Sequence, residues 1–394
     1  MLFNTYAASH EDLQQAARSP QLEEVLLEPM LLARQGTLTV SQAQALAQAA
    51  QQLNLRPVLV WDILMTESQI QQVGDRLSQW DLSCFSAVRV ADVGAALWVK
   101  AHCPTLPLQF IAEHGNHNWI GLLTWCEALG PSLDRIVLSI ELPEQKLIHY
   151  CQSLPVNCEV LGAGPILLFY SPRSLLATQV GSPPQDSQPL IQATLQTEDY
   201  GDRSFPVQES LHGTLMYLDK DQFILDRLAP LAAAGLHTVR LDLRHLGQYG
   251  QVACGIDQLC DQCLNHPATV QENWPRPTRA PFFRANRTTA VFPHLKSKLM
   301  PWRDEACVAV CIGSQRGEYG IFRTLRTFHR SQVKTLMLPS GEELPIPDRL
   351  GFYDLAGEAL GTCASDCTIT MDWIRKLASG AILRTVSTRS PASV

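Results

Sequence analysis

The chain has 394 residues, of which 46% are hydrophobic and 18% are charged, and its formal net charge is −7. This length allows one large domain and one smaller domain, and the composition is typical of a soluble globular protein. A negative chain repels phosphate as a whole, so any contact with nucleic acid requires a local basic patch. The sequence starts without the basic and apolar regions of a signal peptide, and no apolar run is long enough to cross a membrane. We therefore expect a cytoplasmic protein with no membrane contact, whose twelve cysteines are reduced thiols.

Short apolar runs alternate with helical patterns over the first 245 residues, and this pattern predicts eight strands. The expected strands are residues 2–6, 25–28, 57–64, 87–90, 108–113, 135–138, 158–161 and 238–243. Helical patterns lie between them, among them a helix over residues 221–234 before the last strand. Eight β-then-α units predict an α/β fold, a TIM-type (β/α)8 barrel. An open doubly wound sheet is the alternative, but no glycine-rich phosphate loop follows the first strand.

The remaining sequence divides into further segments. We expect the barrel over residues 1–265, with a Pro-, Gln- and Ser-rich loop insertion at residues 181–205. Residues 266–305 form a basic, aromatic-rich linker in this interpretation. From residue 306 to 386 the pattern changes to short alternating strands separated by turn signals, which predicts a small all-β, barrel-like domain.

Polar residues follow most of the expected barrel strands, where a (β/α)8 barrel carries its function. We single out six of them as candidate catalytic residues: Tyr170, Arg173, Asp242, Arg244, His114 and His117. Carboxylates also fall at this end, at Glu28, Asp62, Asp92, Glu113 and Glu141. Such a ring suits acid–base chemistry or a small anionic ligand. The alternative is that these are ordinary polar loop residues.

Two clusters contain residue types that bind metals. His114 and His117 lie three positions apart beside Glu113, and Cys254, Cys260 and Cys263 form a C-x5-C-x2-C set. Neither spacing completes a known site, and a helix with buried cysteines explains the second set equally well. We therefore expect that the protein binds no metal and no other cofactor. The alternative is a metal site formed by the three cysteines. The HExxH and GxSxG signatures of hydrolases are also absent from the sequence.

The linker is the most basic part of the chain, with no acidic residue between Asn273 and Arg303. Aromatic residues such as Trp274 and Phe283 are interleaved with its cations. The cations that we expect to contact RNA are Arg276, Arg279, Arg284, Arg287, Lys296 and Lys298. Guanidinium groups neutralise phosphates, and aromatic faces stack unpaired bases. Alternatively, the arginines pair with carboxylates of the barrel and the aromatic residues hold the linker against it.

Several segments resemble the collagenase-like peptidase family U-32. Residues 158–176 are similar to its signature, in which a strand with E-V-x-x-x-G precedes a YSxRC-type run, here Tyr170-Ser171-Pro172-Arg173-Ser174. Arg240-Leu241-Asp242-Leu243-Arg244 resembles the end of an AGVDSFKIEGR-type block. Residues 279–298 resemble the segment after the barrel, and residues from 306 onward resemble the C-terminal domain of longer members.

The resemblance implies a β/α barrel and one of two activities. Some members are described as peptidases that degrade collagen. Others are iron–sulfur proteins that support hydroxylation of tRNA or rRNA bases or of the ubiquinone ring, with four cysteine thiolates around the cluster. At the matching positions this chain has Leu167, Ser174, the cysteine-free segment 181–203, and Gln222 with Phe223. Serine and leucine cannot replace thiolates around iron, so we expect a divergent member without the cluster.

Three functions remain open at this point. The first is RNA modification or RNA binding, in which RNA or a small anionic molecule is the partner. The second is a collagenase-like peptidase. The third is a non-catalytic binding partner of a related family protein.

Overall fold

The computed structural model describes residues 1–112, 117–177, 184, 189–196, 204–246, 256–284, 305–339, 341–347 and 349–385. The chain forms two compact units, Met1–Arg287 and Thr288–Val394. Each unit has a hydrophobic core of its own.

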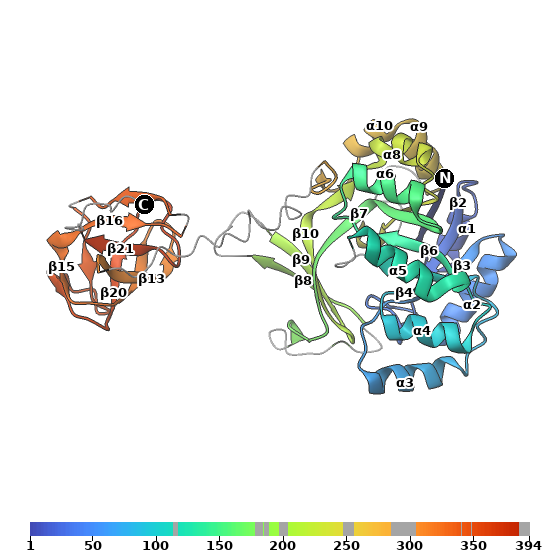
Figure 1. Cartoon of the computed structure of the whole chain (residues 1–394), viewed down its shortest axis with the longest axis horizontal. Helices are drawn as coiled ribbons and strands as arrows, with labels where there is room; N and C mark the ends of the chain where they lie inside the picture. Colours follow the sequence, from blue (N-terminus) through green and yellow to red (C-terminus); the bar gives the residue numbers. More distant parts are fainter. Residues whose placement is uncertain are drawn as a thin grey trace. The chain divides into compact units, whose positions relative to one another are not determined.

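Eight parallel strands in the first unit close into a barrel, as the sequence predicts (Figure 1). The strands are β1 (Leu2–Tyr6), β2 (Leu22–Leu27), β3 (Arg56–Trp61), β4 (Ala87–Val90), β5 (Leu108–Ala112), β6 (Leu133–Leu138), β7 (Asn157–Ser171) and β11 (Thr238–Leu241). The barrel closes because β11 pairs in parallel with both β1 and β7. All eight expected strands are present, and the fold class is the TIM-type barrel.

Helices follow the barrel strands and cover their outer faces (Figure 1). The α-helices among the described residues of this unit are α1 (His10–Ala16), α2 (Val40–Gln52), α3 (Glu67–Leu77), α4 (Val93–His102), α5 (Trp119–Leu129), α6 (Glu144–Ser153), α8 (Leu228–Ala233), α9 (Ile256–Asn265) and α10 (Pro267–Glu272). Single 3-10 turns occur at Gly130–Ser132, Leu225–Arg227 and Arg244–Leu246. The start of α1 follows the local sequence, because the Ser9 hydroxyl accepts from the Asp12 N–H and the Asp12 carboxylate accepts from the Ser9 N–H.

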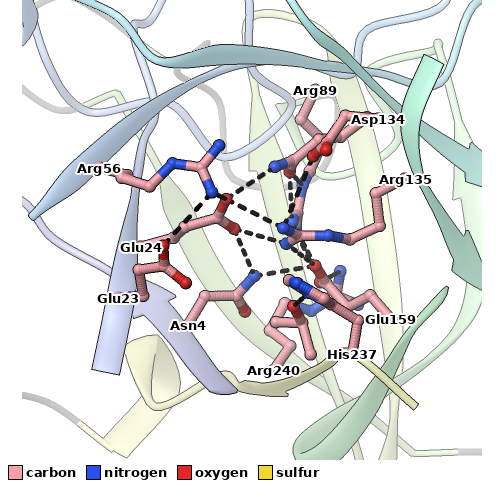
Figure 2. A network of polar contacts seen from close by, with 12 residues as sticks. Asn4, Glu23, Glu24, Arg56, Arg89, Asp134, Arg135, Glu159, His237 and Arg240 are labelled. Carbon is pink, nitrogen blue, oxygen red and sulfur yellow. Dashed lines mark hydrogen bonds and ion pairs between the residues drawn. The ribbon is translucent and has the colours of Figure 1, made fainter. Parts of the chain in front are cut away.

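The inside of the barrel has two layers. A small apolar layer contains Leu26, Val58, Val60 and Ala87. The other layer is a polar group that we name the barrel-core network, made of Asn4, Glu24, Arg89, Gln109, Arg135, Glu159 and Arg240 (Figure 2).

Glu159 is the centre of the barrel-core network (Figure 2). Its carboxylate accepts from Arg89 at 2.5 and 2.8 Å, from Asn4 at 2.8 Å and from Arg135 at 3.2 Å. Arg135 also donates to both oxygens of Glu24, at 2.5 and 3.0 Å. Every charge in this layer therefore has a counter-charge nearby, which is the condition for keeping it inside a protein.

One barrel strand, β7, continues beyond the barrel and joins three further strands in a curved extension that we name the hood. It consists of residues 165–171 of β7 together with β10 (Gly213–Phe223), β9 (Ser204–Ser210) and β8 (Ile191–Gln196), all antiparallel (Figure 1). The His212 ring at the β9–β10 turn contacts the Met30 carbonyl after β2, with a distance of 2.6 Å. The hood therefore reaches across from β7 to the opposite part of the barrel.

The hood corrects two expectations. Residues 221–223 are the end of β10, so the expected helix at 221–234 shortens to a 3-10 turn and α8. The expected loop at 181–205 contains β8 and the first residues of β9. The β8 sequence IQATLQ is short and largely polar. Its apolar alternation therefore could not distinguish an edge strand from a loop.

The second unit contains antiparallel strands. Its larger sheet comprises β13 (Cys307–Gln315), β14 (Tyr319–Thr324), β16 (Val333–Met337), β17 (Glu343–Pro345), β18 (Phe352–Tyr353), β20 (Thr368–Asp372) and β21 (Ile382–Thr385). A smaller sheet pairs β15 (Phe328–His329) with β19 (Thr362–Cys363). Among the helices described in either unit, none is long and apolar enough to span a membrane.

Candidate functional site

We name the carboxyl ends of the barrel strands the mouth of the barrel. At the mouth, one arginine lies between two carboxylates. Arg244 donates to both oxygens of Glu28, at 2.6 and 2.7 Å, and to both oxygens of Asp242, at 2.6 and 2.9 Å. Its guanidinium also lies 3.5 Å from the centre of the Tyr6 ring. Asp242 lies where β7 passes closely, because a Cβ on Gly164 (φ +146°) would come within 2.7 Å of the Asp242 side chain. Three strands, β1, β2 and β11, thus contribute to one charged cluster.

The balance between burial and the Arg244 charge differs for the two carboxyl groups around Arg244, and their acidities differ as a result. Burial raises the pKa of Glu28 to about 7, because the nearby Arg244 only partly offsets the loss of water. Burial would also raise the pKa of Asp242, but Arg244 outweighs it and holds that pKa below its usual value. Two neighbouring carboxyl groups with different acidities are the arrangement from which acid–base chemistry is built.

A second pair lies beside the first. The Asp62 carboxylate after β3 accepts from the Arg34 backbone N–H at 2.7 Å and from its side-chain Nε at 2.9 Å. The Arg34 guanidinium lies 5.1 Å from the Tyr170 ring centre, and the Tyr170 hydroxyl donates to the His212 carbonyl at 2.8 Å. This arrangement connects the mouth to the underside of the hood.

A histidine and a serine meet at the end of β6. His117 Nε2 lies 3.0 Å from the Ser139 hydroxyl and 3.7 Å from a Glu141 oxygen. The Tyr150 hydroxyl donates to the His117 carbonyl at 2.7 Å and fixes that loop. Ser139 is buried, whereas Glu141 is partly exposed and lines a cavity of the mouth.

Two cavities lie between the mouth and the hood. The first, of about 70 Å³, is lined by the Arg34–Asp62 and Arg244–Asp242 pairs and, from the hood, by Leu167, Leu215 and Tyr217. The second, of about 260 Å³, is lined by Glu28 and Asp12 of the barrel and by Gln192 and Gln208 of the hood. Tyr6, Gln35 and Arg244 line both cavities, so the two spaces adjoin. Adjoining cavities with polar walls at the mouth are where a barrel protein binds a ligand.

Basic residues also lie in the segment that follows α10. β12 (Thr278–Arg279) pairs with the end of β10, and the Phe283 carbonyl accepts from the Glu144 N–H at the start of α6. The segment between Trp274 and Arg284 therefore runs along the rim of the mouth, and we name it the rim segment. Arg279 and Arg284 are exposed, whereas Arg276 is half-buried and forms a 3.2 Å ion pair with the buried Asp221. Trp274 and Phe283 are buried and hold the segment to the barrel.

The structure brings together some of the candidates from the sequence and separates others. Asp242 and Arg244 share one cluster, Tyr170 lies near Arg34, and His117 lies beside Ser139. Arg173 is exposed on the hood, and Asp92 caps α4 by accepting from the Ala95 N–H. Cys260 and Cys263 are buried in α9. The candidates outside the described residues are Glu113, His114, Cys254, Arg287, Lys296 and Lys298.

The residues near the hood do not fit an iron–sulfur cluster. Leu167 lines the first cavity, Ser174 is exposed, and the Gln222 amide donates to the Leu161 carbonyl at 3.1 Å. None of these side chains supplies a thiolate, which such a cluster requires. The buried cysteine on β7, Cys158, lies at the opposite end of that strand, next to Asn157 where β7 begins.

Sequence reasoning missed Tyr6, Arg34, Gln208 and Tyr217 as residues of the mouth. Tyr6 ends its strand, and an aromatic residue there is equally common in a core. Arg34 lies in the connection after β2, and its contact with Asp62 depends on how that connection folds. Tyr217 and Gln208 belong to the hood, whose strands the sequence did not predict.

Comparison with known proteins identifies the family. The profile of peptidase family U32 matches residues 30–247, more than half of the chain. No curated protein matches the chain. Among solved structures, the C-terminal domain of a putative U32 peptidase from Geobacillus thermoleovorans is 14% identical and covers 21% of this chain and 100% of its own, with a TM-score of 0.18.

Two further solved structures are similar over larger parts of the chain. A chitinase from Chromobacterium violaceum is 13% identical over 61% of this chain and 94% of its own, with a TM-score of 0.32. A conserved protein of unknown function from Enterococcus faecalis is 7% identical over 98% of this chain and 91% of its own, with a TM-score of 0.36. The family match spans β3 to β11 and the connection that contains Arg34, and the chain therefore belongs to peptidase family U32.

Proposed function

We propose that this U32 protein binds RNA and takes part in the modification of tRNA or rRNA, such as base hydroxylation, without the family's iron–sulfur cluster. One observation carries the proposal: the exposed Arg279 and Arg284 lie on the rim of the mouth that holds the two cavities. Exposed guanidinium groups attract a phosphate backbone, and a polar cavity next to them can receive an unstacked nucleotide. Because the chain as a whole is negative, it repels a phosphate backbone elsewhere, and exposed cations at this one place would direct RNA to the mouth.

The chemistry of the mouth supports a role beyond simple binding. Glu28 has a pKa of about 7, so it can accept or donate a proton near neutral pH. Arg244 neutralises charge on both carboxylates, and Tyr6 stacks on its guanidinium. These residues would orient a polar group and move a proton at the Glu28 carboxyl.

Measurement of RNA affinity against salt concentration tests the binding step. A double variant, Arg279→Ala with Arg284→Ala, removes two exposed cations, so the slope of log K against log [salt] becomes shallower by about 1.4 to 1.8. Arg18→Ala, an exposed arginine just after α1, is the matched control and leaves the slope unchanged. An unchanged slope in the double variant contradicts binding through the rim segment.

Proteolysis is a second candidate, and the contact between His117 and Ser139 favours it. A histidine within 3.0 Å of a serine hydroxyl is the arrangement that activates a serine nucleophile. Gelatin digestion by the pure protein that is abolished in Ser139→Ala and retained in Ser210→Ala supports this candidate. Gelatin that stays intact with the wild-type protein rules it out.

A further inference from the structure

We infer that Cys151 and Cys158 form a peroxide-sensitive thiol pair, in which Cys151 is oxidised first and Cys158 then closes a reversible disulfide with it. The pair lies where α6 ends and β7 begins, at the amino ends of the barrel strands. This is the end of the barrel opposite the mouth. The inference therefore assigns a second site to the chain and does not depend on the binding of RNA.

The two thiols lie close together at this junction. Cys151 is in the last turn of α6, and Cys158 is the second residue of β7. The Cys158 side chain points back toward the helix, because its Sγ lies 3.9 Å from the Tyr150 carbonyl oxygen and 4.0 Å from the Val156 carbonyl oxygen. A hydrogen bond joins the Cys158 thiol to the Cys151 sulfur. A disulfide therefore only has to bring the two sulfurs from hydrogen-bond contact to about 2 Å.

Exposure gives the two cysteines different roles. Cys158 is 1% exposed, whereas Cys151 is half-buried and lines an open cleft of about 590 Å³. Asp134, Pro155 and Gly235 form other parts of the wall of this cleft. A small oxidant that enters the cleft therefore meets Cys151 and not Cys158. The cleft also leaves room for the Cys151 side chain to turn toward its partner.

The hydrogen bond between the thiols favours the same division of roles. Donation from the Cys158 thiol lowers the pKa of Cys151, although burial opposes this change, and the same bond together with burial raises the pKa of Cys158. The thiolate is the form of cysteine that reacts with peroxide, so Cys151 is the more reactive of the two. By contrast, burial raises the pKa of Cys103, a half-buried thiol just after α4. Cys103 is therefore a matched control for Cys151.

The reaction has two steps, and hydrogen peroxide is the oxidant. In the first step the Cys151 thiolate attacks one peroxide oxygen, the S–O bond forms, the O–O bond breaks, and the departing hydroxide takes up a proton to become water. In the second step the Cys158 sulfur attacks the Cys151 sulfur, and the S–S bond forms as the S–O bond breaks. The Cys158 proton leaves with the hydroxide as a second water. Two thiols and one peroxide thus give one disulfide and two waters, and the sulfurs supply the two electrons.

Peptide mass spectrometry of the full chain, first reduced and then treated with hydrogen peroxide, tests the inference. Both cysteines lie in one tryptic peptide, residues 147–173, so their disulfide makes this peptide two hydrogens lighter and blocks alkylation of both thiols. The wild-type chain should form the disulfide at least about tenfold faster than peroxide oxidises Cys103. Dithiothreitol should restore both thiols, because thiol–disulfide exchange reverses the bond.

Variants of single cysteines separate the two roles. In Cys158→Ala the oxidised Cys151 should persist as a sulfenic acid that dimedone traps, whereas in Cys151→Ser the Cys158 thiol should stay reduced. Cys103→Ser should form the disulfide at the wild-type rate. The wild-type measurement decides the matter even if Cys158→Ala does not fold. Both thiols still open to alkylation in the peroxide-treated wild type, or oxidation of Cys103 as fast as that of Cys151, would overturn the inference.

Discussion

Arg244 donates two hydrogen bonds to Glu28, at 2.6 and 2.7 Å, and joins the end of β11 to the end of β2 across 216 positions of sequence. The same guanidinium binds Asp242 and stacks on Tyr6. One side chain therefore organises the part of the mouth that borders both cavities.

Removal of Arg244 should destabilise the protein strongly. Arg244→Ala leaves the buried Glu28 and Asp242 carboxyl groups without their cation, which typically costs about 3–5 kcal/mol. Urea unfolding measures this loss. Arg173→Ala, which removes an exposed arginine of the hood, is the control and should change the free energy of unfolding by less than about 0.5 kcal/mol. Equal stability of the two variants would contradict the described role of Arg244.

Glu28 should make stability depend on pH near neutrality. Its folded-state pKa of about 7 exceeds the ordinary value of 4.5, so the folded state holds the proton more tightly than the unfolded state. The resulting stabilisation is complete below pH 4.5 and disappears as the pH rises through about 7. From the size of the shift, the wild type should lose on the order of 3 kcal/mol relative to Glu28→Gln over this range.

The comparison with Glu28→Gln isolates this carboxyl, because other titrating groups contribute equally to both proteins. Urea unfolding at pH 4.5, 6 and 8 measures the difference. Parallel stability curves for the two proteins would show that the Glu28 carboxyl keeps its ordinary acidity.

Glu159 should protect the barrel against acid. Burial opposes ionisation of this carboxyl, but Arg89, Arg240 and Arg135 outweigh it and lower the pKa to about 2. Its stabilisation is therefore present above pH 4.5 and is lost as the pH falls toward 2. Glu159→Gln should destabilise the protein by about 3–5 kcal/mol at pH 7 and remove this part of its acid sensitivity.

The neighbouring Glu23 provides the matched control for Glu159. It lies at the edge of the same network, where its ion pair with Arg56 spans 3.5 Å and both side chains are 35% exposed. Glu23→Gln should cost less than about 1 kcal/mol, because solvent screens the pair. A small effect of Glu159→Gln, similar to that of Glu23→Gln, would contradict the central place of Glu159 in the network.

The cysteines of the second unit should differ in reactivity. Burial raises the pKa of the Cys363 thiol, and the side chain is inaccessible, whereas Cys367 is exposed. Iodoacetamide at pH 7.5 should therefore alkylate Cys367 at least about tenfold faster than Cys363. Peptide mass spectrometry after timed quenching measures both rates. Faster labelling of Cys363 would be inconsistent with the described packing.

The barrel strands were predictable because parallel strands covered by helices are nearly continuous apolar runs. Arg89 and Arg135 were not recognised as interior residues, because a charged residue within a short strand is compatible with either face. Their partner Glu159 lies 70 and 24 positions away, and pairing over such distances is set only by closure of the barrel.

Part of the mouth was predictable because the barrel strands themselves were predictable. Asp242 and Arg244 directly follow a strand, so the barrel rule placed them at the mouth. The hood was not predictable, because β7 continues through glycines and a proline that normally end a strand. Because the hood was not predicted, the sequence placed neither Gln208 nor Tyr217 near the barrel.

The modified-nucleoside profile of RNA from cells that lack this protein tests the central proposal most directly. Mass spectrometry of digested tRNA and rRNA should show the loss of one modified nucleoside, restored by the wild-type chain and only weakly by the double variant Arg279→Ala with Arg284→Ala. The wild-type chain and Arg18→Ala should restore it equally. A profile identical to that of normal cells would contradict a role for this U32 protein in RNA modification.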